Sequence, residues 1–263
     1  MQSVRALFTW GARTFFRDAE EWGLTRRAAL VIALVPLAII ACLVVISALS
    51  FVNHDLFRPV FRWVTAEDSL LEWGQFLCVF ISAGLFTIMG FRLLRMGQYG
   101  IGLLYVLIGL SAFFVAGEEI SWGQRVFGWS TPEALDEINH QGETNVHNIR
   151  WVQALFGYVV LLGGMYGTVT PLLALRFPGK RPRTLLNFLL IPPLCTVPAF
   201  MMPFGYRTFR ALIWPETDFM VVKFGEAPEL CLYIGLLVFA WLNMRHLRQA
   251  ADEKNVAQVA SPV

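Results

Sequence analysis

The stretch AALVIALVPLAIIACLVVISALSF, residues 28–51, contains no charged side chain over 24 residues. A helix needs about 20 apolar residues to cross the hydrocarbon core of a bilayer, and this stretch is long enough. Lipid offers the backbone no hydrogen-bond partners, so a run of this length predicts a helix. Its length and the 27 residues before it argue against a cleavable signal peptide. We therefore interpret it as a retained membrane helix.

Five further apolar runs follow along the chain, at residues 70–94, 100–116, 151–175, 185–206 and 228–244. Apolar residues make up 56% of the composition and charged residues only 15%, and the mean hydropathy is +0.56. Soluble domains contain about 25% charged residues, so these values argue against a soluble enzyme. The sequence predicts an all-α, multi-pass membrane protein with six transmembrane helices between residues 28 and 245.

Lysines and arginines are distributed unevenly over the segments that join these runs. Of the 21, fourteen lie in the N-terminal segment, at the end of the second run or after it, after the fourth run, or in the C-terminal segment. The other seven lie in the alternate connections. The positive-inside rule assigns the richer side to the cytoplasm. Both termini are therefore predicted to be cytoplasmic, with the chain in the inner membrane and residues 246–263 forming a cytoplasmic tail.

The N-terminal segment, residues 1–27, places Leu7, Phe8, Phe15 and Trp22 at roughly helical spacing with arginines between them. This pattern predicts an amphipathic helix on the inner leaflet, and a disordered basic tail is the alternative. The net charge of +2 is small, and no basic stripe follows the remaining sequence. We expect membrane lipids as partners and no nucleic acid.

Glutamates from three predicted helices fall at the outer membrane boundary. Glu72 lies near the start of the second run, Glu118 and Glu119 follow the third, and Glu226 and Glu229 flank the start of the sixth. Ionisable groups at membrane depth are costly, so they indicate a functional site. Capping of a helix N-terminus is the alternative and fits Glu226 and Glu229 best. Glu118 and Glu119 lie at a helix C-terminus, where the macrodipole disfavours negative charge, so they need other partners.

The predicted outer loop, residues 117–150, carries a second group of chemical candidates. His140, Glu143 and His147 share one face if their segment is helical. Imidazole and carboxylate groups suit zinc, iron or manganese, and three protein ligands would leave a position open for catalysis. Hydrogen-bonding or acid–base roles for the two histidines are an alternative, and a solvated surface is another. Arg125 is the nearest candidate to hold the glutamate pair or to bind an anionic head group.

Prolines interrupt the fifth apolar run, at Pro192, Pro193, Pro198 and Pro203. Each removes a hydrogen bond from a helix, so a regular span is not expected. Irregular backbone at membrane depth is tolerated only against protein or water. The run therefore predicts either a broken helix that lines a cavity or a kinked helix at a packed interface.

Two segments of the outer loop resemble a known motif pair. GEEISWGQR, residues 117–125, and NHQGETNVHN, residues 139–148, are similar to a pair found in an uncharacterised family of bacterial polytopic membrane proteins. The resemblance covers about a quarter of the chain. It implies a multi-pass membrane protein and no particular activity.

A weaker similarity is to the CAAX-protease and bacteriocin-processing membrane proteins, which carry Glu-Glu-x-x-x-Arg on one helix and histidines on later helices. Here the glutamate pair is followed by Arg125 after a longer gap, and the histidines lie in the adjoining loop. The His-x-x-x-Asn motif of that family is also missing, because Thr144 and Trp151 occupy the positions of the asparagine. The similarity implies only a site of glutamates with histidines at a membrane.

Three functions are compatible with these residues. The first is an enzyme at the outer face that hydrolyses or transfers a group on a lipid, lipid-linked or membrane-peptide substrate, with a glutamate activating water. The second is an accessory membrane subunit, and the third is a proton-coupled transporter, whose polar site usually lies near the membrane midplane. The candidate catalytic residues are Glu72, Glu118, Glu119, Arg125 and Glu143, and the candidate metal ligands include His140 and His147.

Overall fold

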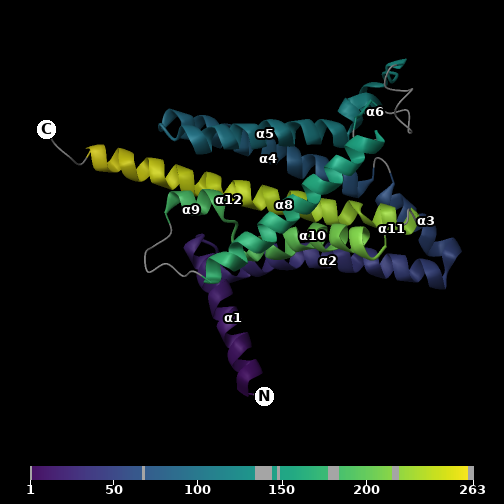
Figure 1. The fold of residues 1–263 in the computed structure, drawn as a ribbon, viewed down its shortest axis with the longest axis horizontal. Helices are drawn as coiled ribbons and strands as arrows, with labels where there is room; N and C mark the ends of the chain where they lie inside the picture. The colour runs from purple at the N-terminus through teal and green to yellow at the C-terminus, as the bar shows by residue number, and fades with distance from the viewer. Residues whose placement is uncertain are drawn as a thin grey trace.

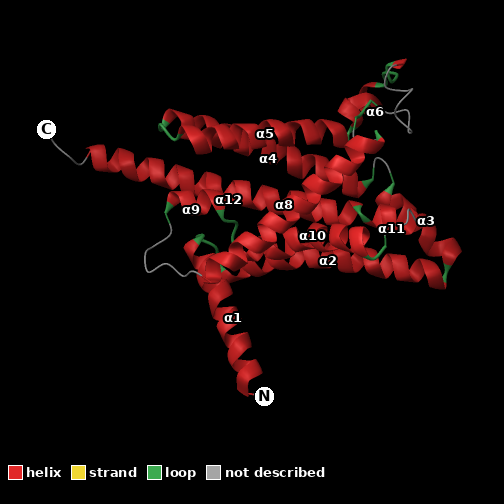
Figure 2. Ribbon diagram, viewed as in Figure 1, coloured by secondary structure: helices red, strands yellow, loops and turns green. Residues whose placement is uncertain are grey.

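The computed structural model describes residues 2–66, 69–133, 144–146, 149–176, 184–214 and 219–259. This part of the chain is helical and contains no strand, as the helix-coloured ribbon of Figure 2 shows. The helices are α1 (Gln2–Glu21), α2 (Arg26–Val52), α3 (His54–Thr65), α4 (Leu70–Arg95), α5 (Tyr99–Glu119), α6 (Gln124–Phe127), α8 (Arg150–Arg176), α9 (Leu185–Leu190), α10 (Val197–Leu212), α11 (Phe219–Phe224) and α12 (Glu226–Val259). Two short 3₁₀ turns, η1 (Ser121–Gly123) and η2 (Leu194–Thr196), complete the elements.

Six helical segments are long and apolar enough to cross a membrane. They are Arg26–Val52, His54–Arg95, Tyr99–Glu119, Trp151–Leu175, Leu185–Leu212 and Phe219–Ala250. The prediction of an all-α chain with six such helices is confirmed for the described residues. α12 continues as a helix to Val259, so the predicted boundary between the sixth run and the tail coincides with no break in the helix.

The long helices form a bundle with α12 at its centre. α12 packs against α4 on one side and against α10 and α2 on the other, while α4 pairs with α5 and α8 pairs with α10. Figure 1 shows α12 between the α4–α5 pair and the α2–α10 pair. Accordingly, α12 belongs to the most buried of the six candidate spans.

Glycines allow α4 and α5 to approach each other closely. A Cβ at Gly90 would lie 2.9 Å from the Gly102 carbonyl oxygen, and one at Gly109 would lie 2.8 Å from the Thr87 backbone nitrogen. Small residues at helix interfaces are the usual means of packing helices in lipid, where no hydrophobic drive joins two apolar surfaces. The α4–α5 hairpin thereby forms the rigid wall that ends in the glutamate pair.

The fifth apolar run is broken, as its prolines predict. α9 ends at Leu190, the chain passes through Pro192 and Pro193, and the helix resumes through η2 into α10. Both prolines and all three residues of η2 are buried. The break is therefore packed against protein, whereas α10 beyond it lines a cavity described below.

A side chain from α1 holds this break. The Leu194 amide donates a hydrogen bond of 2.7 Å to Asp18 Oδ2, and Asp18 is only 5% exposed. Nearby, Trp22 is buried with its ring edge against Phe188 of α9 and His246 of α12. Figure 1 shows α1 projecting away from this end of the bundle, across the direction of the long helices. The end of α1 is thus part of the protein core.

An Asp18→Ala variant should be less stable by about 2 kcal/mol, because the buried Leu194 amide then loses its charged acceptor. Glu20→Ala is the matched control, since Glu20 is exposed and pairs with exposed Arg26 at 3.6 Å. That change should stay within about 0.5 kcal/mol of the parent. Equilibrium unfolding in detergent micelles measures both values. Equal stabilities would contradict a structural role for Asp18.

Candidate functional site

The end of α5 places two adjacent glutamates in different surroundings. Glu118 is 4% exposed, and its two oxygens accept hydrogen bonds from Trp122 Nε1 and from the Val146 amide, each 2.7 Å long. Glu119 Oε1 accepts a hydrogen bond of 2.9 Å from the Tyr233 hydroxyl of α12. Consecutive helical residues diverge by roughly 100°, which explains why the two carboxylates meet different partners.

A tight left-handed turn brings Trp122 back onto α5. Ser121 and Trp122 have φ values of 46° and 54°, and Gly123 follows with 81°. Non-glycine residues in this region cost of the order of 1 kcal/mol or more and are frequent at functional sites. The Trp122 ring covers Gly117, where a Cβ would lie 2.9 Å from ring atoms. The turn therefore delivers an indole N–H to a carboxylate that would otherwise be buried beside unfavourable helix carbonyls.

The end of the outer loop returns to the same place. Asn145, 1% exposed, donates to Ser121 Oγ at 3.1 Å, and the neighbouring Val146 amide binds Glu118. Gln124 donates to Thr131 Oγ1 at 2.9 Å and also accepts from the Thr144 amide. Residues 144–146 are thus hydrogen-bonded to the end of α5 and to the turn and short helix that follow it.

Carboxylates from three helices lie within electrostatic range of one another. The charges of Glu72 on α4 and of Glu226 and Glu229 on α12 all act on Glu119 of α5. This agrees with the arrangement expected from the topology, in which α4, α5 and α12 deliver acids to one end of the bundle. We call Glu72, Glu119, Glu226 and Glu229 the acid cluster.

Polar and basic side chains surround the acid cluster. Gln75, fully buried on α4, donates through Nε2 to the Glu226 carbonyl at 2.8 Å and to its carboxylate at 3.3 Å. Lys223 Nζ lies 3.9 Å from Glu226 Oε1. Arg207 of α10 forms an ion pair with Glu229, and both side chains are largely buried. These contacts balance part of the negative charge inside the protein.

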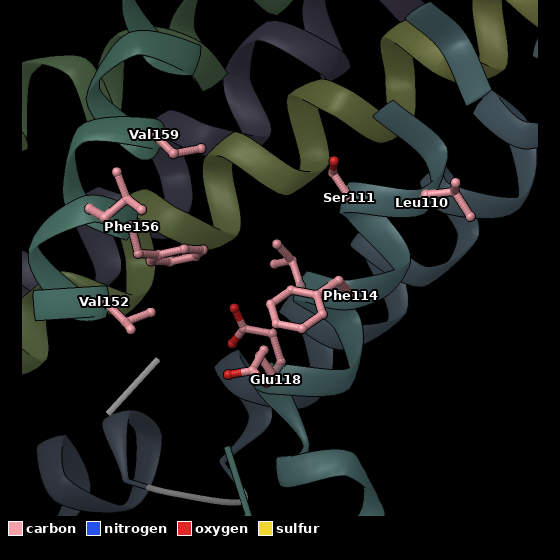
Figure 3. Close-up of a pocket in the computed structure, with 10 residues that line it drawn as sticks. Leu110, Ser111, Phe114, Glu118, Val152, Phe156 and Val159 are labelled. Atoms are coloured by element: carbon pink, nitrogen blue, oxygen red, sulfur yellow. The ribbon is translucent and has the colours of Figure 1, made fainter. Parts of the chain in front are cut away.

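An apolar cavity of about 510 Å³ opens between α5 and α8 and ends at the glutamate pair. Its walls are Leu110, Ser111, Phe114 and Val115 of α5 and Val152, Leu155, Phe156 and Val159 of α8, with Glu118 and Glu119 completing the lining. Figure 3 shows Phe156 and Val152 directed toward Phe114 and Glu118 across this space. The site therefore combines a long apolar chamber with two carboxylates at one end.

Among the residues predicted for the site, Glu72, Glu118 and Glu119 are brought to one region. His140, Glu143 and His147, which carry the metal hypothesis, lie outside the described residues, as does the side chain of Arg125. Within the part of the chain that the structure describes, no group of three or more His, Cys, Asp or Glu residues could hold a metal ion.

Three site residues were not anticipated. They are Tyr233, which binds Glu119, Arg207, which pairs with Glu229, and Gln75, which binds Glu226. For Gln75 and Tyr233, the spacing in the sequence could have indicated a place in the site. Gln75 follows Glu72 by three residues and Tyr233 follows Glu229 by four, and both spacings place polar groups on one helix face.

Comparison of the chain with protein-family models, with curated proteins and with solved structures gives no match. The functional argument therefore depends on the geometry of the site.

Proposed function

We propose that the six long helices span a membrane and that the protein is an enzyme whose site lies at the outer boundary. Glu119 would act as general acid or base on a lipid, lipid-linked or membrane-peptide substrate, in a hydrolysis or group transfer. One observation carries the proposal. Two adjacent carboxylates, held by unlike partners, line the same end of an apolar cavity.

The unlike partners suggest a division of roles. Glu118 is held by an indole N–H and a backbone amide, so it would fix the end of α5 and the returning loop. Glu119 accepts a hydrogen bond from the Tyr233 hydroxyl and has three carboxylates within electrostatic range, so it is the better candidate for proton transfer. Carboxylate pairs in unlike environments commonly divide acid and base functions in this way.

The shape of the cavity supports an amphiphilic substrate. From Leu110 to Glu119 the α5 wall extends nine residues, about 14 Å at 1.5 Å per residue. One leaflet of the hydrocarbon core is about 15 Å thick. A single hydrocarbon chain would therefore lie along the walls while the reacting head group meets the carboxylates. Water for a hydrolysis would come from the side of the loop end at Thr144–Val146.

A metal-assisted variant of this chemistry remains a prediction from the sequence. His140, Glu143 and His147 precede or follow the loop residues that contact Glu118 and Ser121. Zinc held there would lower the pKa of a bound water and supply the nucleophile.

The test compares the parent chain with Glu119→Gln in liposomes made from a total bacterial lipid extract. We expect mass spectrometry to show a lipid consumed by the parent and turnover lowered about 10²- to 10⁴-fold in the variant, because a positioned acid–base group contributes that much. Glu133→Gln is the matched control, since Glu133 is exposed. Identical lipid profiles for the parent and Glu119→Gln would favour the accessory-subunit role instead.

A further inference from the structure

A second cavity is lined by α10 but by no residue of α8. It shares no lining residue with the α5–α8 cavity. Its volume is about 830 Å³, and its walls come from α2, α10, α11 and the start of α12. The lining includes Ile40 and Phe51 of α2 and Met202, Tyr206 and Phe209 of α10. Neither the acid cluster nor its apolar chamber uses this space.

The dimensions of the second cavity match one leaflet. Ile40 and Phe51 lie eleven residues apart on the same helix, about 16 Å at 1.5 Å per residue. The lining is apolar and aromatic with three methionines, which adapt to irregular occupants. The cavity is also open beside Gly205, because a Cβ at that position would meet no atom within 4 Å. The space therefore fits a hydrocarbon chain that enters from the bilayer.

Cationic side chains lie beside one end of this cavity. Arg210 follows the lining residue Tyr206 by one helical turn and acts electrostatically on it. Arg210 Nη1 is buried and has no hydrogen-bond partner among the described residues. The Arg62 guanidinium of α3 lies 5.5 Å from the ring centre of Phe219, which precedes the lining residue Met220. A buried guanidinium nitrogen requires an acceptor, and a phosphate oxygen suits it well.

We propose that the second cavity binds an anionic phospholipid. One acyl chain occupies the space between α2 and α10, and the phosphate group is bound at Arg210 with Arg62 nearby. The lipid is a resident ligand, distinct from any substrate of the α5–α8 cavity. The Tyr206 ring contacts the chain, and its neighbour Arg207 holds Glu229, so the bound lipid also supports the helix that neutralises the acid cluster.

Native mass spectrometry from micelles containing phosphatidylglycerol or phosphatidylcholine tests this proposal. Gly205→Leu fills the cavity, and Gly84→Leu is the matched control, because Gly84 is exposed on α4 and its Cβ would also meet nothing within 4 Å. We expect the parent and Gly84→Leu to retain one more phosphatidylglycerol molecule per chain than Gly205→Leu. Equal retention by the two glycine variants would overturn the assignment of the acyl chain to this cavity.

Arg210→Gln tests the head-group site separately. The parent should prefer phosphatidylglycerol over phosphatidylcholine, and the variant should lose that preference by about tenfold while still retaining a lipid in the cavity. Arg95→Gln is the control, because Arg95 lies at the opposite end of α4 from Glu72. An unchanged preference in Arg210→Gln would overturn the anionic-lipid assignment. Circular dichroism of each variant in lipid-free micelles checks that the helices are intact.

Discussion

A Gly164→Ala variant is expected to lose about 3 kcal/mol of unfolding free energy, because the added methyl group meets the backbone of α10. A Cβ at Gly164 would lie 2.8 Å from both the Phe200 carbonyl oxygen and the Phe204 amide nitrogen. Backbone atoms in the middle of a packed helix cannot rotate away as a side chain can. The two helices must separate, and overpacking of this kind costs about 1–3 kcal/mol or more.

The adjacent glycine provides the matched control. A Cβ at Gly163 would lie 3.7 Å from Leu232 Cδ1, which is an ordinary contact. Alanine is favoured over glycine in a helix by up to about 1 kcal/mol, so Gly163→Ala should be as stable as the parent or more stable. Chemical unfolding in mixed micelles, followed by helical circular dichroism, compares the two variants. Similar stabilities would show that α8 and α10 do not pack as closely as described.

The number and type of the long helices could be predicted, because an apolar run long enough to cross a bilayer is expected to be helical. In lipid a backbone must satisfy its own hydrogen bonds, so 24 uncharged residues at 28–51 leave only a helix as the answer. The prolines of the fifth run were equally informative, since η2 and the break between α9 and α10 follow them. The prolines could not predict what packs around the break, because that depends on Asp18, which lies 176 residues before Leu194 in the chain.

The convergence of acids was predictable, but their partners were not. Helix direction alone places Glu72, Glu119 and Glu226 at one end of the bundle. Arg125 was the expected partner of the glutamate pair because it is nearest in sequence. The side chain of Arg125 lies outside the described residues, so that pairing stays a prediction. Among the described groups, an indole N–H and a backbone amide bind Glu118, and the positive-φ turn at η1 delivers the indole. Gly123 is the only residue of that turn whose type predicts a positive φ.

Glu226 and Glu229 lie at the helix start, where the capping interpretation expects them. Both lie in the first turn of α12, where the helix dipole favours a carboxylate. They also bind Gln75 and Arg207, which belong to other helices. Gln75 lies 151 residues from Glu226 in the chain, and Arg207 lies 22 residues from Glu229. A single sequence does not show that these residues are in contact, so the position of the two glutamates at a helix start did not reveal their tertiary partners.

The Arg207–Glu229 pair carries the second large expected effect. Arg207→Gln should lower the free energy of unfolding by about 3 kcal/mol, because removing one partner of a largely buried pair leaves a charge without compensation. That charge acts on Glu119 and on Glu226, so repulsion within the acid cluster adds to the loss. The exposed Arg17–Glu21 pair, 3.4 Å apart on α1, is the comparison. Arg17→Gln should cost less than about 1 kcal/mol.

A double-mutant cycle separates charge from packing. If the loss in Arg207→Gln comes from the uncompensated Glu229 carboxylate, adding Glu229→Gln should recover most of it, since neutral amides then replace both charges. If Arg207 matters mainly because its guanidinium group packs near Gly157 and over the Tyr206 ring, the double variant should remain as unstable as the single one. Raised salt should change neither result greatly, because a buried pair is poorly screened. Recovery in the double variant would therefore identify the charge of the acid cluster as the reason that α10 carries an arginine at this position.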